Sequence, residues 1–149
     1  MGNICRSPSG ESVMNGLIVK NNLQDRITCD SAGTIAYHSG EPADARMKSH
    51  AVKRGYDLTS IARQIKQFDF DRFDYIIAMD SENYRNILSL DTEVKHKNRV
   101  SMMLEYATQY DDTDVPDPYY GGEQGFEYVL DLLEDACLGL LKHIVKNDF

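Results

Sequence analysis

The amino-acid sequence predicts an α/β fold: a three-layer sandwich in which a four-stranded parallel sheet is flanked by helices on both faces. Two observations predict it. Helical and strand patterns alternate along the 149 residues, as they do where helices join parallel strands. The first ten residues also look like an anion-binding loop that leads into a helix, and such loops follow the carboxyl end of a strand. The length fits one domain over residues 1–149.

The first predicted helix runs from Pro8 to about residue 22. Ser7 is a favoured N-cap, and Pro8 suits the first helical position because the N–H it lacks has no partner there. Apolar side chains then recur at helical spacing: Val13, Met14, Leu17 and Ile18. Residues 26–30 are predicted as a short strand, and the small residues 31–34 as a turn.

The middle of the chain predicts two more strands and two more helices. Residues 42–54 form a helix that stops at Gly55, and residues 73–79 form a strand apolar enough to be buried on both faces. Asp80 or Ser81 then caps a helix that runs to about residue 90. Residues 100–104 are the next strand.

The last helix is predicted by one continuous apolar stripe. Its members are Phe126, Val129, Leu130, Leu133, Ala136, Cys137, Leu140, Leu141 and Ile144. Three strands are therefore predicted within the chain, and the anion-binding loop implies a fourth, which we expect to precede Met1.

Charge and cysteine content exclude several classes of partner. The net charge of −8 and pI near 4.9 argue against nucleic acid or an anionic membrane as the main partner. No apolar run approaches the roughly 20 residues of a membrane span. Three cysteines without metal-ligand spacing fit a reducing cytosol, and the four histidines suggest no metal site. We therefore expect a cytoplasmic protein that uses no cofactor or metal.

A thiol placed directly before Met1 would complete a recognisable reactive loop. Five residues would then separate that cysteine from Arg6. Loop N–H groups, the helix dipole and a guanidinium together lower a thiol pKa into the range of about 3.5–7.5. A thiolate of this kind attacks a phosphoester, and the same N–H groups stabilise charge on the phosphoryl oxygens in the transition state.

The sequence resembles the low-molecular-weight protein-tyrosine phosphatases over essentially its whole length. The resemblance rests on Gly2-Asn3-Ile4-Cys5-Arg6-Ser7-Pro8 together with Asp117-Pro118-Tyr119-Tyr120-Gly121 far downstream. Residues 30–34, 62–64 and 75–80 follow in the order expected of the family. The resemblance also implies that the strand before the loop is central in the sheet, between Ile27 and Ile76.

The resemblance implies roles for the residues of the loop. Arg6 would bind the phosphate of the substrate and of the transition state, Ser7 would hydrogen-bond the nucleophilic thiolate, and Asn3 would hold the loop in shape. Cys5 matches a second loop cysteine that traps the nucleophile as a reversible disulfide; as a residue it also suits a small, inert core position. The expected substrate-binding residues of the loop are Gly2, Asn3, Ile4, Cys5 and Ser7.

The downstream motif would supply the acid and the wall of the pocket. Asp117 would protonate the leaving phenolate, and Tyr119 and Tyr120 would line the mouth, where aromatic rings suit an aryl phosphate. The residues alone also allow a plain alternative, in which Asp117 is a turn former and the tyrosines only pack. The implied substrates are tyrosine-phosphorylated proteins or small aryl phosphates, and the implied assembly is a monomer or weak homodimer.

Two departures from the family pattern matter. The nucleophilic cysteine would precede Met1, so residues 1–149 are predicted to be inactive as printed. The family's histidine near the loop is also missing around residues 59–61. The alternatives are a catalytically dead protein that binds phosphate or phosphotyrosine and, less favoured, an arsenate reductase. The reductase needs a relay of further cysteines, whereas Cys29 and Cys137 lie in different predicted elements.

Overall fold

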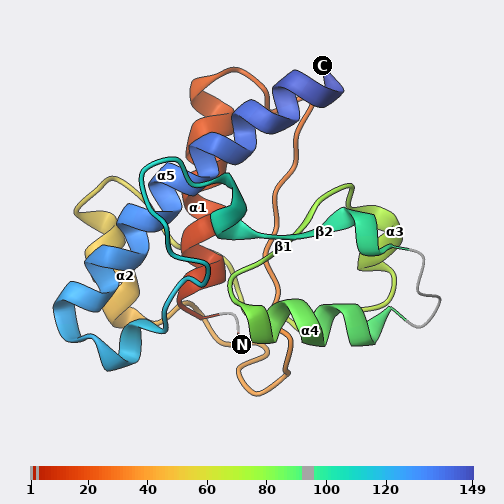
Figure 1. The fold of residues 1–149 in the computed structure, drawn as a ribbon. Helices are drawn as coiled ribbons and strands as arrows, with labels where there is room; N and C mark the ends of the chain where they lie inside the picture. The colour runs from red at the N-terminus through yellow and green to blue at the C-terminus, as the bar shows by residue number, and fades with distance from the viewer. Residues whose placement is uncertain (1, 3, 92–95) are drawn as a thin grey trace.

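A computed structural model describes residues 2, 4–91 and 96–149 of the chain. Its α-helices are α1 Arg6–Lys20, α2 Ala45–Val52, α3 Asp69–Arg72, α4 Ser81–Leu90 and α5 Gly122–Asp148. Its strands are β1 Ile76–Ala78 and β2 Val100–Met102, and single 3₁₀ turns cover Lys97–Arg99, Met103–Tyr106 and Pro118–Tyr120. Figure 1 shows α1 beside α5 on one side of the strands and α4 on the other. No helix in the described ranges is long and apolar enough to cross a membrane.

The described sheet has two strands, whereas the sequence predicts a four-stranded sheet with three of its strands within the chain. β1 and β2 are parallel, with Ile76 opposite Val100. Residues 26–30, predicted as a strand, form an extended segment that is not paired with any described strand (Figure 1). The physical reason is that a strand exists only with a hydrogen-bonded neighbour, and a cavity of about 930 Å³ separates this segment from β1.

The two strands are also shorter than predicted. The predicted strand 73–79 pairs only over Ile76–Ala78, and the predicted strand 100–104 turns after Met102 into the 3₁₀ helix Met103–Tyr106. In that turn the Glu105 carboxylate accepts the Met102 N–H. This local hydrogen bond ends the strand.

Helix α1 starts two residues before the predicted start. Its N-cap is Cys5, which makes no side-chain cap bond, so the prediction that Ser7 caps the helix is wrong. Pro8 lies within the first turn, where it costs no intrahelical hydrogen bond. The Ser9 hydroxyl donates to the Cys5 carbonyl at 2.7 Å and holds the turn between loop and helix.

Aspartates cap two of the other helices. The Asp44 carboxylate accepts the N–H groups of Arg46 and Met47, so α2 begins after the predicted residue 42. The Asp80 carboxylate accepts the Asn83 N–H at 2.7 Å, and α4 covers Ser81–Leu90 as predicted. Both caps place a carboxylate next to the loop that precedes α1.

Helix α5 forms the centre of the main core. Every residue of the predicted apolar stripe is buried along this helix, which packs against α1 and the Met103–Tyr106 turn. Gly139 allows that contact, because a Cβ there would collide with the Tyr106 carbonyl. A second core cluster lies on the α4 side of the sheet and comprises Phe70, Ile76, Ala78, Ile87 and Val100.

Candidate active site

The candidate site is built around Arg6, at the first turn of α1. Its Nη1 donates to the Asp80 Oδ2 atom and to the Val115 carbonyl, both at 2.7 Å. The Val115 N–H in turn donates to the Met79 carbonyl at 2.8 Å. The loop before α1, the end of β1 and the segment before Pro118–Tyr120 therefore meet at one guanidinium.

Asp80 is held as a carboxylate in this arrangement. Burial opposes its charge, but the Asn83 N–H and the Arg6 guanidinium outweigh burial and lower the pKa of Asp80. Only 9% of the Arg6 side chain and 18% of the Asp80 side chain are exposed, so solvent screens the pair weakly. The pair fixes the position of Arg6.

Cys5 lies in the same loop and is buried. Burial, together with the negative charge of Asp44, raises the pKa of its thiol to about 12, although a hydrogen bond with Tyr119 works in the opposite direction. The thiol is therefore protonated at neutral pH. It does not offer the thiolate that a nucleophile needs.

Tyr119 joins the candidate site to α2. Its hydroxyl donates to the Asp44 Oδ2 atom at 2.8 Å, and the Arg46 guanidinium carbon lies 4.6 Å from the centre of its ring. Burial opposes the charge of Asp44, but bonds from Tyr119 and the Met47 N–H outweigh it and lower the pKa of Asp44. The Asp44 N–H also donates to the Ile4 carbonyl at 2.7 Å. The loop, the cap of α2 and the downstream tyrosine thus form one connected unit.

Asp117 and Tyr120 are both at the surface. The Asp117 carboxylate accepts the Tyr119 N–H at 3.0 Å and caps the 3₁₀ turn, while its charge contributes to the raised pKa of Cys5. Asp117 is therefore near the loop and also makes the bond expected of a turn former. The Tyr120 side chain is 91% exposed, whereas that of Tyr119 is less than half exposed.

The remaining predicted loop residues have varied surroundings. Gly2 packs so closely against the His38 ring that a Cβ would collide with it. Ile4 is half-buried against the main core, and Ser7 is half-buried in the first turn of α1. Asn3 lies outside the described residues, so its predicted role remains a prediction.

A cavity of about 30 Å³ lies beside Ser7 and is also lined by Thr34 and Asn83. The Thr34 hydroxyl and the Asn83 side-chain amide nitrogen are buried without a partner among the described residues, as is the hydroxyl of Ser60. A polar cavity of this size accommodates a water molecule. Thr34 and Asn83 therefore give the cavity beside Ser7 a polar lining.

The other two cysteines are also protonated. Burial raises the pKa of Cys29 to about 12 and raises the pKa of Cys137 still further. All three thiols are free. No group of three or more His, Cys, Asp or Glu side chains within the described ranges is arranged to hold a metal ion.

The contacts that hold the candidate site together are only partly predictable from the sequence. Asp80 is predicted as a helix cap at the end of a strand, where it could also support the loop, and its bond to Arg6 shows that it does. No motif in the sequence singles out Asp44 or Arg46. One residue of the acidic run at 111–114 lies next to the site, since the Asp114 carboxylate accepts the Ser81 hydroxyl at 2.8 Å; Asp112 instead accepts the hydroxyl of Tyr128 on α5. The one available signal was an aspartate three residues before Met47, which is the spacing of an N-cap.

Comparisons with known proteins identify the family. The low molecular weight phosphotyrosine protein phosphatase family matches residues 1–148. A putative low molecular weight protein-tyrosine-phosphatase of Synechocystis is 50% identical over 99% of this chain and 94% of its own length. The human low molecular weight phosphotyrosine protein phosphatase is 36% identical over 95% of this chain and 90% of its own length. Among solved structures, the chain matches the crystal structure of a protein tyrosine phosphatase from Entamoeba histolytica with Hepes in its active site. The two are 45% identical, with a TM-score of 0.95, over 100% of this chain and 95% of the other. This chain belongs to the low molecular weight phosphotyrosine protein phosphatase family.

Proposed function

We propose that this protein hydrolyses phosphotyrosine and other aryl phosphate monoesters through a cysteinyl-phosphate intermediate, with a cysteine joined directly to Met1 as the nucleophile. The observation that carries the proposal is the fixed position of Arg6, which Asp80 and Val115 hold at the N-terminus of α1, next to Cys5, on which Tyr119 and Asp117 both act. Family membership supports it. The raised pKa values of Cys5, Cys29 and Cys137 support the view that none of these thiols replaces the nucleophile.

The proposed reaction has two steps. The thiolate attacks phosphorus, the bond between phosphorus and the aryl oxygen breaks, and Asp117 gives its proton to the leaving phenolate. Water then attacks the phosphocysteine, Asp117 takes a proton from that water, and the sulfur leaves as a thiolate. Arg6 and the N–H groups at the start of α1 stabilise the charge on the phosphoryl oxygens in both steps.

The site surroundings support an aromatic substrate. The Tyr119 ring is held by Asp44 and Arg46 at the edge of the loop, where it offers a flat apolar wall to an aryl group. Substrates would be tyrosine-phosphorylated proteins or small aryl phosphates. The cysteine usage supports a cytoplasmic location, and we expect a monomer or weak homodimer.

Hydrolysis of an aryl phosphate tests the function in two chains. Residues 1–149 are expected to show no turnover above background. The extended chain, defined as residues 1–149 preceded by a short apolar strand that ends in cysteine, is expected to turn over and to trap phosphate on that cysteine, which mass spectrometry detects. The control replaces only the added cysteine with serine.

Either of two results would overturn the proposal. Turnover by residues 1–149 would show that a thiol is not supplied from before Met1. An extended chain that folds and binds phosphate but shows no turnover would favour the alternative of a phosphate- or phosphotyrosine-binding protein. Arsenate reduction by the extended chain would favour the reductase alternative.

A further inference from the structure

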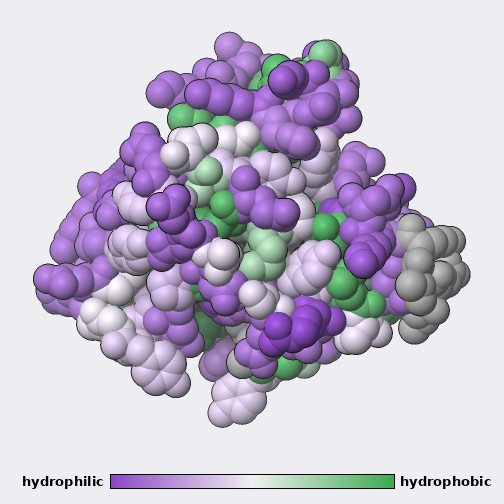
Figure 2. Space-filling view, in the orientation of Figure 1, coloured by the Kyte–Doolittle hydropathy of each residue, from purple (hydrophilic) through white to green (hydrophobic). Residues whose placement is uncertain are grey.

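Residues 107–117 form an arm that leads from the Met103–Tyr106 turn to Asp117 (Figure 1). None of these residues belongs to a helix or strand, and Val115 is the single buried one among them. Figure 2, in the same orientation, shows mostly hydrophilic side chains at the surface around a few apolar ones. Burial of apolar side chains is therefore not enough to fix this segment, which we call the acid arm, and its position depends on hydrogen bonds.

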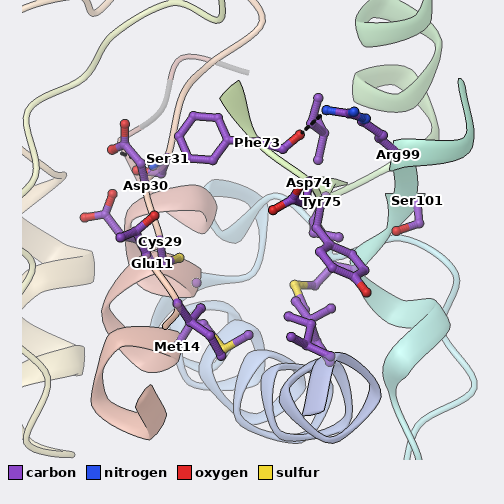
Figure 3. A pocket seen from close by; sticks show the side chains of 18 of the residues that line it. Glu11, Met14, Cys29, Asp30, Ser31, Phe73, Asp74, Tyr75, Arg99 and Ser101 are labelled. Carbon is purple, nitrogen blue, oxygen red and sulfur yellow. Dashed lines mark hydrogen bonds between the residues drawn. The ribbon is translucent and has the colours of Figure 1, made fainter. Parts of the chain in front are cut away.

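The amino end of the acid arm is fixed to the main core. Ser101, which Figure 3 shows on β2, shares a hydrogen bond of 2.9 Å with the Tyr106 hydroxyl. The Asp135 carboxylate on α5 then accepts the N–H groups of Thr108 and Gln109, both at 2.9 Å, and the Thr108 hydroxyl at 2.8 Å. Burial opposes the charge of Asp135, but these bonds outweigh it and lower its pKa. The arm therefore starts from a fixed point on α5.

Tyr128, also on α5, holds the middle of the acid arm. Its hydroxyl donates to the Asp112 carboxylate and lies 2.9 Å from both of its oxygens. The bond to Asp112 raises the pKa of Tyr128, so the hydroxyl keeps the proton that it donates. The Tyr128 and Tyr110 rings also meet edge to face, with their centres 5.9 Å apart. Helix α5 thus fixes the arm at two successive points.

The carboxyl end of the acid arm is fixed to the residues that hold Arg6. The Asp114 Oδ1 atom accepts both the N–H of Ser81, at 3.1 Å, and the hydroxyl of Ser81, at 2.8 Å. The next residue, Val115, donates its N–H to the Met79 carbonyl at 2.8 Å, and its carbonyl accepts the Arg6 Nη1 atom at 2.7 Å. The end of the arm and the segment after β1 are therefore joined side by side, and Arg6 bonds to both.

Two prolines extend this fixed position to Asp117. Pro116 and Pro118 flank Asp117, and a proline ring holds its own φ at about −65°. A residue before a proline is restricted to extended backbone, and Asp117 has φ −74° and ψ 119°. Few backbone rotations therefore remain free between Val115 and Asp117. Bonds that fix Asp114 and Val115 also limit where the Asp117 carboxylate can lie.

We propose that Asp114 is a positioning residue for Asp117, with Tyr128 as a second one: by fixing the acid arm, they set the place of the proton donor relative to Arg6. The proposal rests on the reaction proposed above. A proton donor acts only within hydrogen-bond reach of the leaving oxygen, and a misplacement of about 1 Å can cost on the order of 10²-fold in rate. Arg6 keeps its bond to Asp80 whether or not the arm is fixed. Asp114 and Tyr128 are therefore expected to act on protonation of the leaving group and not on phosphate binding.

The kinetic test compares two substrates of the extended chain. Asp114→Ala removes the acceptor of both Ser81 bonds and is expected to lower kcat/KM about tenfold for phenyl phosphate. For nitrophenyl phosphate, whose leaving group needs less protonation, the expected loss is at most about twofold. Inhibition by inorganic phosphate is expected to stay unchanged. Tyr128→Phe removes only a hydroxyl and is expected to show the same pattern, with a loss of about threefold for phenyl phosphate.

Two control variants separate hydrogen bonding from charge. Asp114→Asn keeps an oxygen that can accept both Ser81 hydrogens, so it is expected to retain the kcat/KM of the parent. Asp111→Ala removes a carboxylate from an exposed position of the same acidic run and is expected to leave kcat/KM unchanged.

Backbone amide exchange in residues 1–149, measured by mass spectrometry, needs no catalysis. Asp114→Ala is expected to speed exchange within residues 113–117 about tenfold, because the bonds that fix this end of the acid arm are lost. Exchange in the second half of α5 is expected to remain unchanged. Tyr128→Phe is expected to speed exchange around Asp112 in the same way.

Equal losses of kcat/KM with the two substrates would overturn the proposal, because Asp114 would then act on a step other than protonation. A loss in Asp114→Asn or Asp111→Ala as large as that in Asp114→Ala would do the same, since charge and not hydrogen bonding would be responsible. So would an Asp114→Ala variant with unchanged kinetics or unchanged exchange. An extended chain without any turnover contradicts the proposed function itself, whereas a parent that turns over beside an unaffected Asp114→Ala variant contradicts this proposal alone.

Discussion

The Arg6 Nη1 atom lies 2.7 Å from the Asp80 Oδ2 atom, across 74 positions of the sequence. The same carboxylate caps α4 through its other oxygen, which accepts the Asn83 N–H. The guanidinium that we expect to bind phosphate is therefore tied to the end of β1 and the start of α4. We therefore expect a change at Asp80 to alter the position of Arg6 without any contact between Asp80 and a substrate.

Asp80→Asn is expected to weaken catalysis by the extended chain about tenfold or more in kcat/KM. Asparagine is a good N-cap, so α4 stays capped, but the charge that orients Arg6 is lost. Steady-state hydrolysis of an aryl phosphate measures the effect. Glu82→Gln, which removes an exposed charge from the first turn of the same helix, is the matched control and is expected to change little. Equal effects of the two substitutions would contradict an orienting role for Asp80.

Some elements of the fold could be predicted because their signal is local. Helix α5 carries an unbroken apolar stripe, and the Asp80 cap follows from side-chain chemistry, so both are confirmed. Residues 26–30 carry a strand pattern, but a strand also requires a neighbour, and the structure leaves a cleft there. The sequence pattern predicts that residues 26–30 favour a strand, but no hydrogen-bonded neighbour among the described residues lies beside them, so they are not a strand.

The contacts of the candidate site could not be predicted in the same way. Tyr119 bonds Asp44 across 75 positions, and Arg6 bonds Val115 across 109. No periodicity or spacing in a single sequence encodes such pairs, because they depend on how whole elements pack. The Asp114 bond to Ser81 shows the same limit, because it joins residues 33 positions apart.

Asp117→Asn is expected to lower kcat of the extended chain by about 10²–10⁴-fold for phenyl phosphate, because an amide has no proton to give the leaving phenolate. The loss is expected to be smaller for nitrophenyl phosphate, whose leaving group needs less protonation. Asparagine still accepts the Tyr119 N–H, so the turn remains intact. A comparison of the two substrates measures the effect. Equal losses with both would indicate that Asp117 acts only as a turn former.

Tyr119→Phe and Tyr120→Phe form a matched pair. Tyr119→Phe removes the hydroxyl that bonds Asp44, and a hydrogen bond with a net value of about 0.5–1.5 kcal/mol predicts a rise in KM of about 2–10-fold. Tyr120 is 91% exposed and is expected to tolerate loss of its hydroxyl without change. Steady-state kinetics of the two variants of the extended chain compare them directly. A larger rise in KM for Tyr120→Phe than for Tyr119→Phe would contradict the proposal that Tyr119 forms the aromatic wall.

Cys5 is expected to resist alkylation in the folded chain. Its pKa of about 12 leaves about one thiol in 10⁴ ionised at pH 8, and only the thiolate reacts. Iodoacetamide labelling of residues 1–149 followed by peptide mass spectrometry measures the rate, with the denatured chain as control. Labelling of native Cys5 as fast as in the denatured chain would contradict a buried thiol.

The same burial sets a dependence of stability on pH. The folded state holds the Cys5 proton more tightly than the unfolded state, so this contribution to the free energy of unfolding is fully present below the unfolded pKa near 9. It decreases as pH rises toward about 12, where the folded thiol ionises. Cys5→Ala removes the ionisation, so the variant is expected to lose less stability between pH 8 and pH 11 than the parent chain, as denaturant titrations at each pH would show. An equal decrease in the free energy of unfolding in both chains would mean that groups other than Cys5 cause the loss of stability at alkaline pH.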